Sequence, residues 1–311
     1  MTDLLLHQYD SSPFSEKVRI CLGIKGLEWA AIDQPVVMPK PELLPLTGGY
    51  RKIPVLQVGA DVYCDSVLIV RELEARHPAP SLFPGGTGGI ASALSEWTDR
   101  SFFQAAVAVI FAHVGETIGE EFIKDREKLS GAPFDIAGMK AAFPHMATQL
   151  RSHAANVAQQ LADGRTFLEG DTPGLADANA FYNLWFAGSF YPPSKALFED
   201  LPGLSDWYAR VAAIGHGQRR EGTRAEALAA ARDGAPLADP IPAGEAPAAP
   251  GDAALVGQKV AVSATDYGRD PIAGTLVAAS AHRLVVRRED ADLGAVNVHV
   301  PRLGFALMPA A

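Results

Sequence analysis

Cysteine is scarce in this chain, which has only Cys21 and Cys64 among its 311 residues. Two cysteines give no framework of disulfides, and the eight histidines do not stand at the spacing of metal ligands. The sequence therefore predicts no disulfide scaffold and no metal cofactor. So few cysteines suit a reducing compartment, and we expect a cytoplasmic protein.

Positive charge and long apolar runs are also in short supply. The chain has 27 Lys and Arg residues against 36 Asp and Glu residues, which gives a formal net charge of −9 and argues against a broad nucleic-acid-binding surface. The longest apolar stretch, 102–114, contains Gln104 and His113 and is too short to span a bilayer. The first residues lack a basic stretch followed by a long apolar core, which predicts no signal peptide. We therefore expect neither nucleic acid nor a membrane among the partners.

Apolar residues, in contrast, make up 48% of the chain, as in globular proteins, and 311 residues allow two or three domains. Residues 1–80 alternate apolar strands and helices in a βαβ and then a ββα order, which predicts an α/β domain. The strands are expected near residues 4–9, 30–33, 55–57 and 61–63. Residues 88–232 carry apolar residues at three- and four-residue spacing and predict an all-helical domain.

The C-terminal part of the chain differs from the preceding residues first in composition and then in the spacing of its apolar residues. Residues 233–251 hold five prolines among alanines and glycines, which is typical of an extended linker. In residues 252–311 the apolar spacing switches to two, with turn-rich breaks at 266–271 and 290–294. This pattern predicts a small all-β module, a five-stranded SH3-like barrel. Its six basic and six acidic residues argue against a phosphate-binding surface, and the sequence leaves open whether it packs on the helical domain or recruits a partner.

The most informative motif is Ser-Pro-Phe-Ser at residues 12–15, which follows an apolar run. A serine at the cap position and a proline in the first helical position form a strong helix start. The Ser12 hydroxyl would then lie beside free backbone amides, in a place that holds an anion well. Ser12 is our first catalytic candidate, and Ser11, Ser15 and Tyr9 are alternatives for the same role.

Two further motifs follow at strand ends. Lys52-Ile53-Pro54 joins a turn to a short apolar strand, and Asp65-Ser66 stands where another strand leads into a helix. Ser66 can offer a hydroxyl and an amide to a carboxylate, and Asp65 can accept from an ammonium group. In spacing, the three motifs together resemble the thioredoxin-like N-terminal domain of cytosolic glutathione transferases. The resemblance extends more weakly to about residue 230.

The resemblance implies a site for glutathione as co-substrate. It implies that Ser12 holds the thiol, that the bond before Pro54 is cis, and that the backbone of Ile53 pairs with the cysteinyl unit. It assigns the γ-glutamyl end to Asp65 and Ser66.

The same resemblance implies contacts at the other end of the tripeptide. It places the glycyl carboxylate on Lys52 or a neighbour, with Lys40 and Arg51 as the other candidates. It further implies a homodimer and a helical domain that supplies the pocket of an electrophilic second substrate. For that pocket our candidates are Arg100, Phe103 and Val107.

Activating glutathione means stabilising its thiolate, because the thiolate is the nucleophile. Lowering a thiol pKa by about two units needs roughly 2.7 kcal/mol. A hydrogen bond from Ser12 to the charged sulfur is worth about 1.5–3 kcal/mol, and a helix N-terminus adds about 0.3–1 kcal/mol. Serine rather than cysteine at positions 12 and 15 prevents a mixed disulfide here, so transfer chemistry is favoured over thiol–disulfide exchange.

Residues 170–177 resemble the capping-box segment of the family's helical domain. The usual serine or threonine is replaced by Gly174, with Asp177 three residues later, so we expect part of the local stabilisation to be lost.

The sequence thus predicts a glutathione transferase-like enzyme that joins the sulfur of glutathione to an electrophilic carbon. One alternative is a non-catalytic binding or scaffold protein of the same fold. Another is a glutathione-dependent isomerase or lyase.

Overall fold

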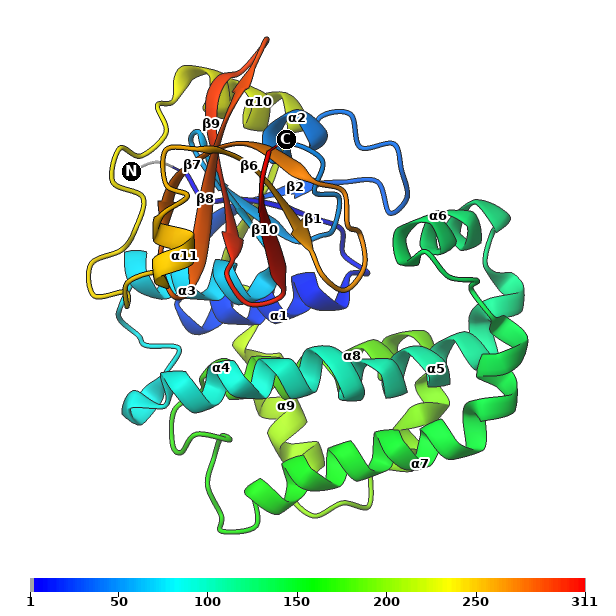
Figure 1. The fold of residues 1–311 in the computed structure, drawn as a ribbon. Helices are drawn as coiled ribbons and strands as arrows, with labels where there is room; N and C mark the ends of the chain where they lie inside the picture. The colour runs from blue at the N-terminus through cyan, green and yellow to red at the C-terminus, as the bar shows by residue number, and fades with distance from the viewer. Residues whose placement is uncertain (1–2, 311) are drawn as a thin grey trace.

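The N-terminal domain has the predicted βαβ and ββα order (Figure 1). In this computed structural model, which describes residues 3–310, β1 pairs with β2 in parallel and with β3 antiparallel, and β4 follows β3 as an antiparallel neighbour. β1, β3 and β4 are buried along their whole length. Their polar residues are also buried and are hydrogen-bonded, namely His7, Gln8, Gln57 and Asp61. The elements are β1 (Leu5–Gln8), α1 (Pro13–Ile24), β2 (Glu28–Asp33), α2 (Leu44–Thr47), β3 (Val55–Val58), β4 (Asp61–Cys64) and α3 (Ser66–Arg76).

A helical domain follows and lies below the sheet in Figure 1. Its central helix is α8, whose residues are buried almost all round and which packs against α1, α4 and α5. Among the described helices, none is both long and apolar enough to cross a membrane. The elements are η1 (Pro84–Gly86), α4 (Gly88–Trp97), the π-helical turn η2 (Thr98–Phe102), α5 (Phe103–Val114), η3 (Gly115–Thr117), α6 (Glu120–Ser130), α7 (Ile136–Gln160), α8 (Leu175–Phe190), η4 (Pro192–Leu197) and α9 (Leu204–Ile214).

The helical segment ends earlier than the sequence indicates. The expectation that 88–232 is all-helical is wrong at β5 (Gln218–Gly222), which pairs in parallel with β2 at the edge of the first domain's sheet. α10 (Arg224–Asp233) then covers that sheet with the buried residues Ala227 and Ala231. β5 carries no apolar alternation because it is an edge strand held mainly by backbone pairing, so periodicity gives no signal for it.

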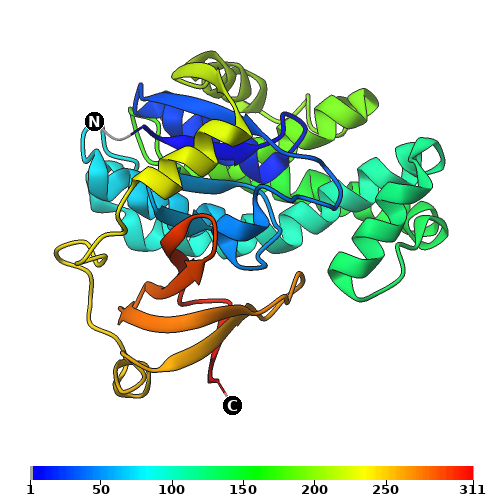
Figure 2. The ribbon, with the colours of Figure 1, turned by 90° about the horizontal axis from the view of Figure 1, so that it is seen from above.

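The C-terminal module has five strands, as predicted, but it does not stand apart from the first domain (Figure 2). Its strands run antiparallel in the order β10-β6-β7-β8-β9, and β9 then pairs in parallel with β4. The result is one ten-stranded sheet that continues from the first domain into the module. The elements are α11 (Pro250–Ala253), β6 (Lys259–Ala264), β7 (Ile272–Ala279), β8 (Arg283–Asp290), β9 (Gly294–Pro301) and β10 (Phe305–Pro309).

Buried charged groups join the module to the first domain. The fully buried Arg283 pairs with Glu72 of α3 at 2.7 Å and with Glu245 of the proline-rich segment at 2.6 Å. Asp61 of β4 accepts a hydrogen bond of 2.8 Å from His299 of β9. Because a buried charge is costly without a partner, these contacts require the module, the proline-rich segment and the first domain to be assembled together.

The start of α8 is capped in an unexpected way. Asp177 accepts from the Gly174 amide at 2.9 Å, as the capping-box motif predicts. The missing hydroxyl is replaced by Glu169, which accepts from the Ala176 amide at 3.0 Å. A Cβ on Gly174 would lie 2.2 Å from that Glu169 oxygen, so glycine leaves room for the substitute cap. The expected loss of stabilisation is therefore offset by Glu169.

A buried ion pair joins α1 to the helical domain. The Lys17 ammonium lies 2.8 Å from the Asp99 carboxylate, with the Lys17 side chain fully buried and that of Asp99 17% exposed. The Tyr182 hydroxyl of α8 donates to the same carboxylate at 2.9 Å. Asp99 thus provides the counter-charge for a lysine that has no access to water.

We predict that Glu169→Ala lowers the free energy of unfolding by about 1 kcal/mol, because it removes a helix cap. Glu169→Gln, which keeps an acceptor oxygen, should lose less. Urea denaturation followed by circular dichroism measures both, with the exposed Glu121→Ala as the control for loss of an acidic residue. Equal stability of Glu169→Ala and Glu121→Ala would show that the cap contributes nothing.

We predict that Asp99→Asn destabilises the chain by about 3 kcal/mol, because it leaves the Lys17 ammonium buried without a counter-charge. The double variant Lys17→Met, Asp99→Asn should recover most of this loss. The exposed Asp206→Asn serves as the matched control in the same urea titration. A double variant as unstable as Asp99→Asn alone would contradict this account.

Candidate active site

Ser12 caps α1 at the edge of the first domain. Its backbone is extended, its amide donates to the Tyr9 carbonyl at 3.0 Å, and its Oγ accepts from the Ser15 amide at 3.2 Å. Ser12 as a whole is 1% exposed, and its hydroxyl keeps a proton that it can donate. The Ser15 hydroxyl is buried and has no hydrogen-bond partner within residues 3–310, whereas Ser11 is exposed.

Tyr9 lies next to Ser12 and to Arg126 of α6. Burial raises the pKa of Tyr9 above its ordinary value, although the Arg126 charge and a hydrogen bond with Ser12 act in the opposite direction. The phenol therefore stays neutral at physiological pH. The Tyr9 phenol is placed to form a hydrogen bond with Ser12 beside a bound anion, and it does not itself become an anion.

The three cations considered for a ligand carboxylate are placed differently. Arg51 pairs with Asp125 of α6 at 2.5 Å. Lys40 donates to a backbone carbonyl and lies 5.9 Å from the Tyr9 ring, and burial lowers the pKa of Lys40 to about 8. Lys52 is followed by Ile53 and the cis bond to Pro54, and its ion-pair partner, Asp266, comes from the C-terminal module.

Asp65 and Ser66 meet at the start of α3. Asp65 has a φ of 78°, an uncommon conformation outside glycine, and its carboxylate caps the helix by accepting from the Val67 amide at 3.0 Å. Ser66 is buried beside it. Burial raises the pKa of Asp65, the Lys52 charge opposes this shift, and Asp99 adds to it. The Asp99 charge of the helical domain therefore makes the Asp65 carboxyl easier to protonate.

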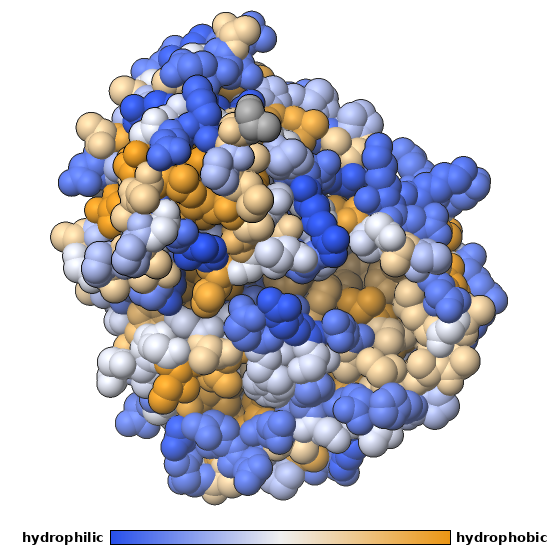
Figure 3. Space-filling model, viewed as in Figure 1, coloured by the Kyte–Doolittle hydropathy of each residue, from blue (hydrophilic) through white to orange (hydrophobic). Residues whose placement is uncertain are grey.

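Apolar side chains gather where the first and helical domains meet. Phe103 of α5 packs against Phe14 of α1 with ring centroids 4.8 Å apart, and the half-buried Val107 follows one helical turn later. Figure 3 shows a hollow with an apolar floor between the sheet-containing half and the helical half of the molecule. Arg100 does not join this group, because its side chain is 59% exposed and pairs with Glu96 on the preceding turn.

Several residues at this boundary were not found by sequence reasoning. One is Asp99, which stands among the polar residues Thr98 and Arg100, so the sequence gives no signal that it is the partner of Lys17. Asp266 and Tyr267 of the β6–β7 loop lie over Lys52, with Asp266 Oδ1 3.0 Å from Lys52 Nζ and the Tyr267 ring centroid 4.6 Å away. No local pattern connects a turn in the C-terminal module with a residue more than 200 positions earlier.

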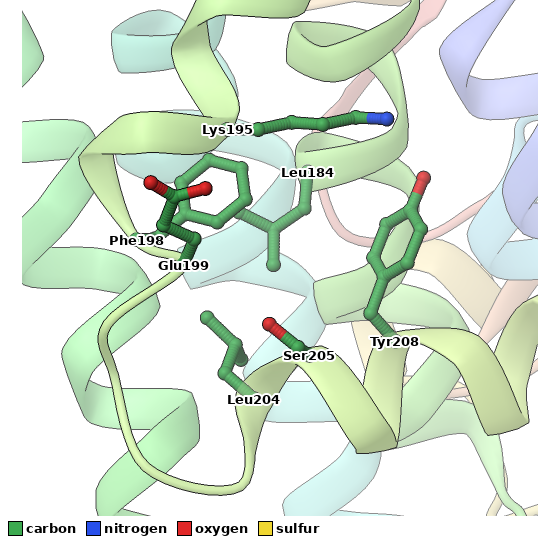
Figure 4. Close-up of a pocket in the computed structure, with 7 residues that line it drawn as sticks. All are labelled: Leu184, Lys195, Phe198, Glu199, Leu204, Ser205 and Tyr208. Carbon is green, nitrogen blue, oxygen red and sulfur yellow. The ribbon is translucent and has the colours of Figure 1, made fainter.

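A separate cavity of about 220 Å³ lies within the helical domain, between α8, η4 and α9 (Figure 4). None of the residues expected at the active site lines it. Its lining consists of Leu184, Lys195, Phe198, Glu199, Leu204, Ser205 and Tyr208. Within the described part of the chain, no group of three or more His, Cys, Asp or Glu side chains is arranged to hold a metal ion.

Comparison with known proteins identifies two family domains in the chain. The family model of the glutathione S-transferase N-terminal domain matches residues 6–81, and that of the C-terminal domain matches residues 140–210. The solved structure of a GST-like protein from Pseudomonas syringae is 35% identical with a TM-score of 0.77, covering 98% of this chain and 99% of that chain. This likeness includes the C-terminal β module.

More distant relatives match smaller parts of the chain. Glutathione S-transferase U13 of Arabidopsis thaliana is 32% identical over 107 residues, which are 33% of this chain and 47% of that protein. The chain spans less than half the length of the curated relatives that it matches. Rice GST1, solved in complex with glutathione, shares the fold at 18% identity and a TM-score of 0.51, covering 73% of this chain and 94% of that chain.

Two family-specific domain matches and a nearly full-length likeness lead to one assignment. This chain belongs to the glutathione S-transferase family.

Proposed function

We propose that the chain is a glutathione transferase-like enzyme that activates the glutathione thiol for attack on an electrophilic small molecule. The observation that carries the proposal is the position of the Ser12 hydroxyl at the N-terminus of α1. Its oxygen accepts from the Ser15 amide, which leaves its proton to donate to a sulfur anion. The rice relative, whose structure was solved in complex with glutathione, supports the choice of co-substrate.

In this mechanism the protein stabilises a charge rather than removing a proton itself. The thiol proton leaves to water when glutathione binds, Ser12 donates to the thiolate, and the helix N-terminus favours the negative charge. The sulfur then donates its electron pair to an electrophilic carbon, and the leaving group departs with the bonding pair. No general base is needed, and the neutral Tyr9 phenol is a second donor beside Ser12.

The remaining contacts hold the tripeptide. The backbone of Ile53, before the cis bond to Pro54, pairs with the cysteinyl unit, and Lys52 attracts the glycyl carboxylate. Ser66 binds the γ-glutamyl carboxylate, and the Asp65 carboxylate attracts the γ-glutamyl ammonium.

The second substrate occupies the apolar hollow between the two domains. Phe103 and Val107 line it together with Phe14, which favours an apolar electrophile. Arg100 is left out of this pocket because its charge is already paired with Glu96 at an exposed position.

Assembly and location are further parts of the proposal. The family resemblance supports a homodimer. The buried, unpaired thiols of Cys21 and Cys64 are consistent with a cytoplasmic location.

We predict that Ser12→Ala lowers kcat for glutathione conjugation by about 10- to 100-fold, because a hydrogen bond to a charged group is worth about 1.5–3 kcal/mol. The bound thiol should also titrate at higher pH, which the ultraviolet absorbance of the thiolate measures. Ser11→Ala, one exposed residue earlier, is the matched control and should leave both quantities unchanged. Equal activity of the two variants would refute the assignment of Ser12.

The same assays separate the alternatives. Glutathione binding without a thiolate band at neutral pH would support a non-catalytic binding protein. An isomerase or lyase would transform its substrate without consuming glutathione, so the loss of free thiol during turnover distinguishes it from a transferase.

A further inference from the structure

The β6–β7 loop, residues 265–271 of the C-terminal module, reaches across to the first domain and contacts Lys52. The Asp266 carboxylate forms an ion pair of 3.0 Å with the Lys52 ammonium. The Lys52 side chain is 12% exposed, whereas that of Asp266 is 42% exposed. The cation beside the Ile53–Pro54 bond is therefore largely covered, and the group that covers it comes from the module.

Backbone and aromatic contacts hold the loop in this position. The Gly268 amide donates to the Leu129 carbonyl at the end of α6 at 2.8 Å. Gly268 has a φ of +62°, and a Cβ there would lie 3.0 Å from Leu129 and 3.4 Å from Lys52, so a larger residue is disfavoured. The Tyr267 ring lies 4.6 Å from the Lys52 ammonium, at cation–π distance. The loop thus lies between Lys52 and α6 and contacts both.

Tyr267 stands beside Asp266 in the loop and stays uncharged. Burial raises the pKa of the Tyr267 phenol, and the negative charges of Asp266 and Asp65 add to the increase. The phenol is therefore neutral at physiological pH. One loop thus places a carboxylate and a neutral aromatic ring over Lys52.

We propose that Asp266 is a specificity-determining residue, whose carboxylate competes with the glycyl carboxylate of glutathione for the Lys52 ammonium. This inference rests on the proposed glutathione site. Two carboxylates repel each other near one ammonium, so a ligand with a charged glycyl end must displace Asp266. A ligand whose glycyl end is uncharged can bind without displacing Asp266 from Lys52. The site therefore discriminates among glutathione derivatives by the charge at that end.

The test compares two ligands by isothermal titration calorimetry: glutathione and its glycyl monoethyl ester. Asp266→Asn should tighten glutathione binding about three- to fivefold, the size expected for a partly exposed ion pair. Binding of the ester should change less than twofold, since it brings no glycyl charge to compete. Asp270→Asn, an exposed acid on the same loop, is the matched control and should change neither affinity.

The same change made in a Lys52→Met protein tests the role of the Lys52 ammonium. In Lys52→Met, the additional change Asp266→Asn should have no effect on glutathione binding, because the ammonium for which the two carboxylates compete is absent.

If the wild type binds glutathione but Asp266→Asn behaves as Asp270→Asn does, the inference fails and the proposed function stands. If neither the wild type nor Asp266→Asn binds either ligand, both fail. An equal gain for glutathione and ester would also overturn the inference, because it would reflect general opening of the loop.

Discussion

The parallel pairing of β4 with β9 is the contact on which the rest of the arrangement depends. It turns two small sheets into one and fixes the orientation of the module relative to the first domain. The buried pair Arg283–Glu72 and the Asp61–His299 hydrogen bond lie between the same two parts of the chain. In any other orientation these buried charged groups would lose their partners. Through this fixed orientation, a turn of the module comes to lie over Lys52.

The candidate site is consequently assembled from three parts of the chain. The first domain supplies Ser12 and Lys17, the helical domain supplies Asp99, and the module supplies Asp266. Lys17 and Lys52 are each matched by an acid from a different part. This pattern means that the electrostatics of the site exist only in the fully folded chain, and that the domains cannot be treated as independent units.

Local features of the fold followed from the sequence, whereas long-range features did not. The cap at Ser12, the strand and helix order of the first domain and the five strands of the module all rest on patterns within a few residues. The Asp61–Asn297 hydrogen bond across β4 and β9 joins residues 236 positions apart, and no local pattern encodes it. The substitute cap by Glu169 was missed because that side chain arrives from a preceding loop. The cis bond before Pro54 and the helix caps at Ser12 and Asp65 follow from the motifs. The acids that pair with Lys17 and Lys52 depend on tertiary contacts.

The continuous sheet also changes which strand edges face solvent. Pairing with β9 covers β4, whose residues are all buried, and leaves β5 and β10 at the two ends of the sheet. β5 carries Arg219 and Arg220 together with Glu221, and β10 ends in Pro309. Charges and proline are the features by which natural proteins prevent edge-to-edge aggregation. The module thus protects an apolar edge from self-association and presents to solvent two edges that are poorly suited to it.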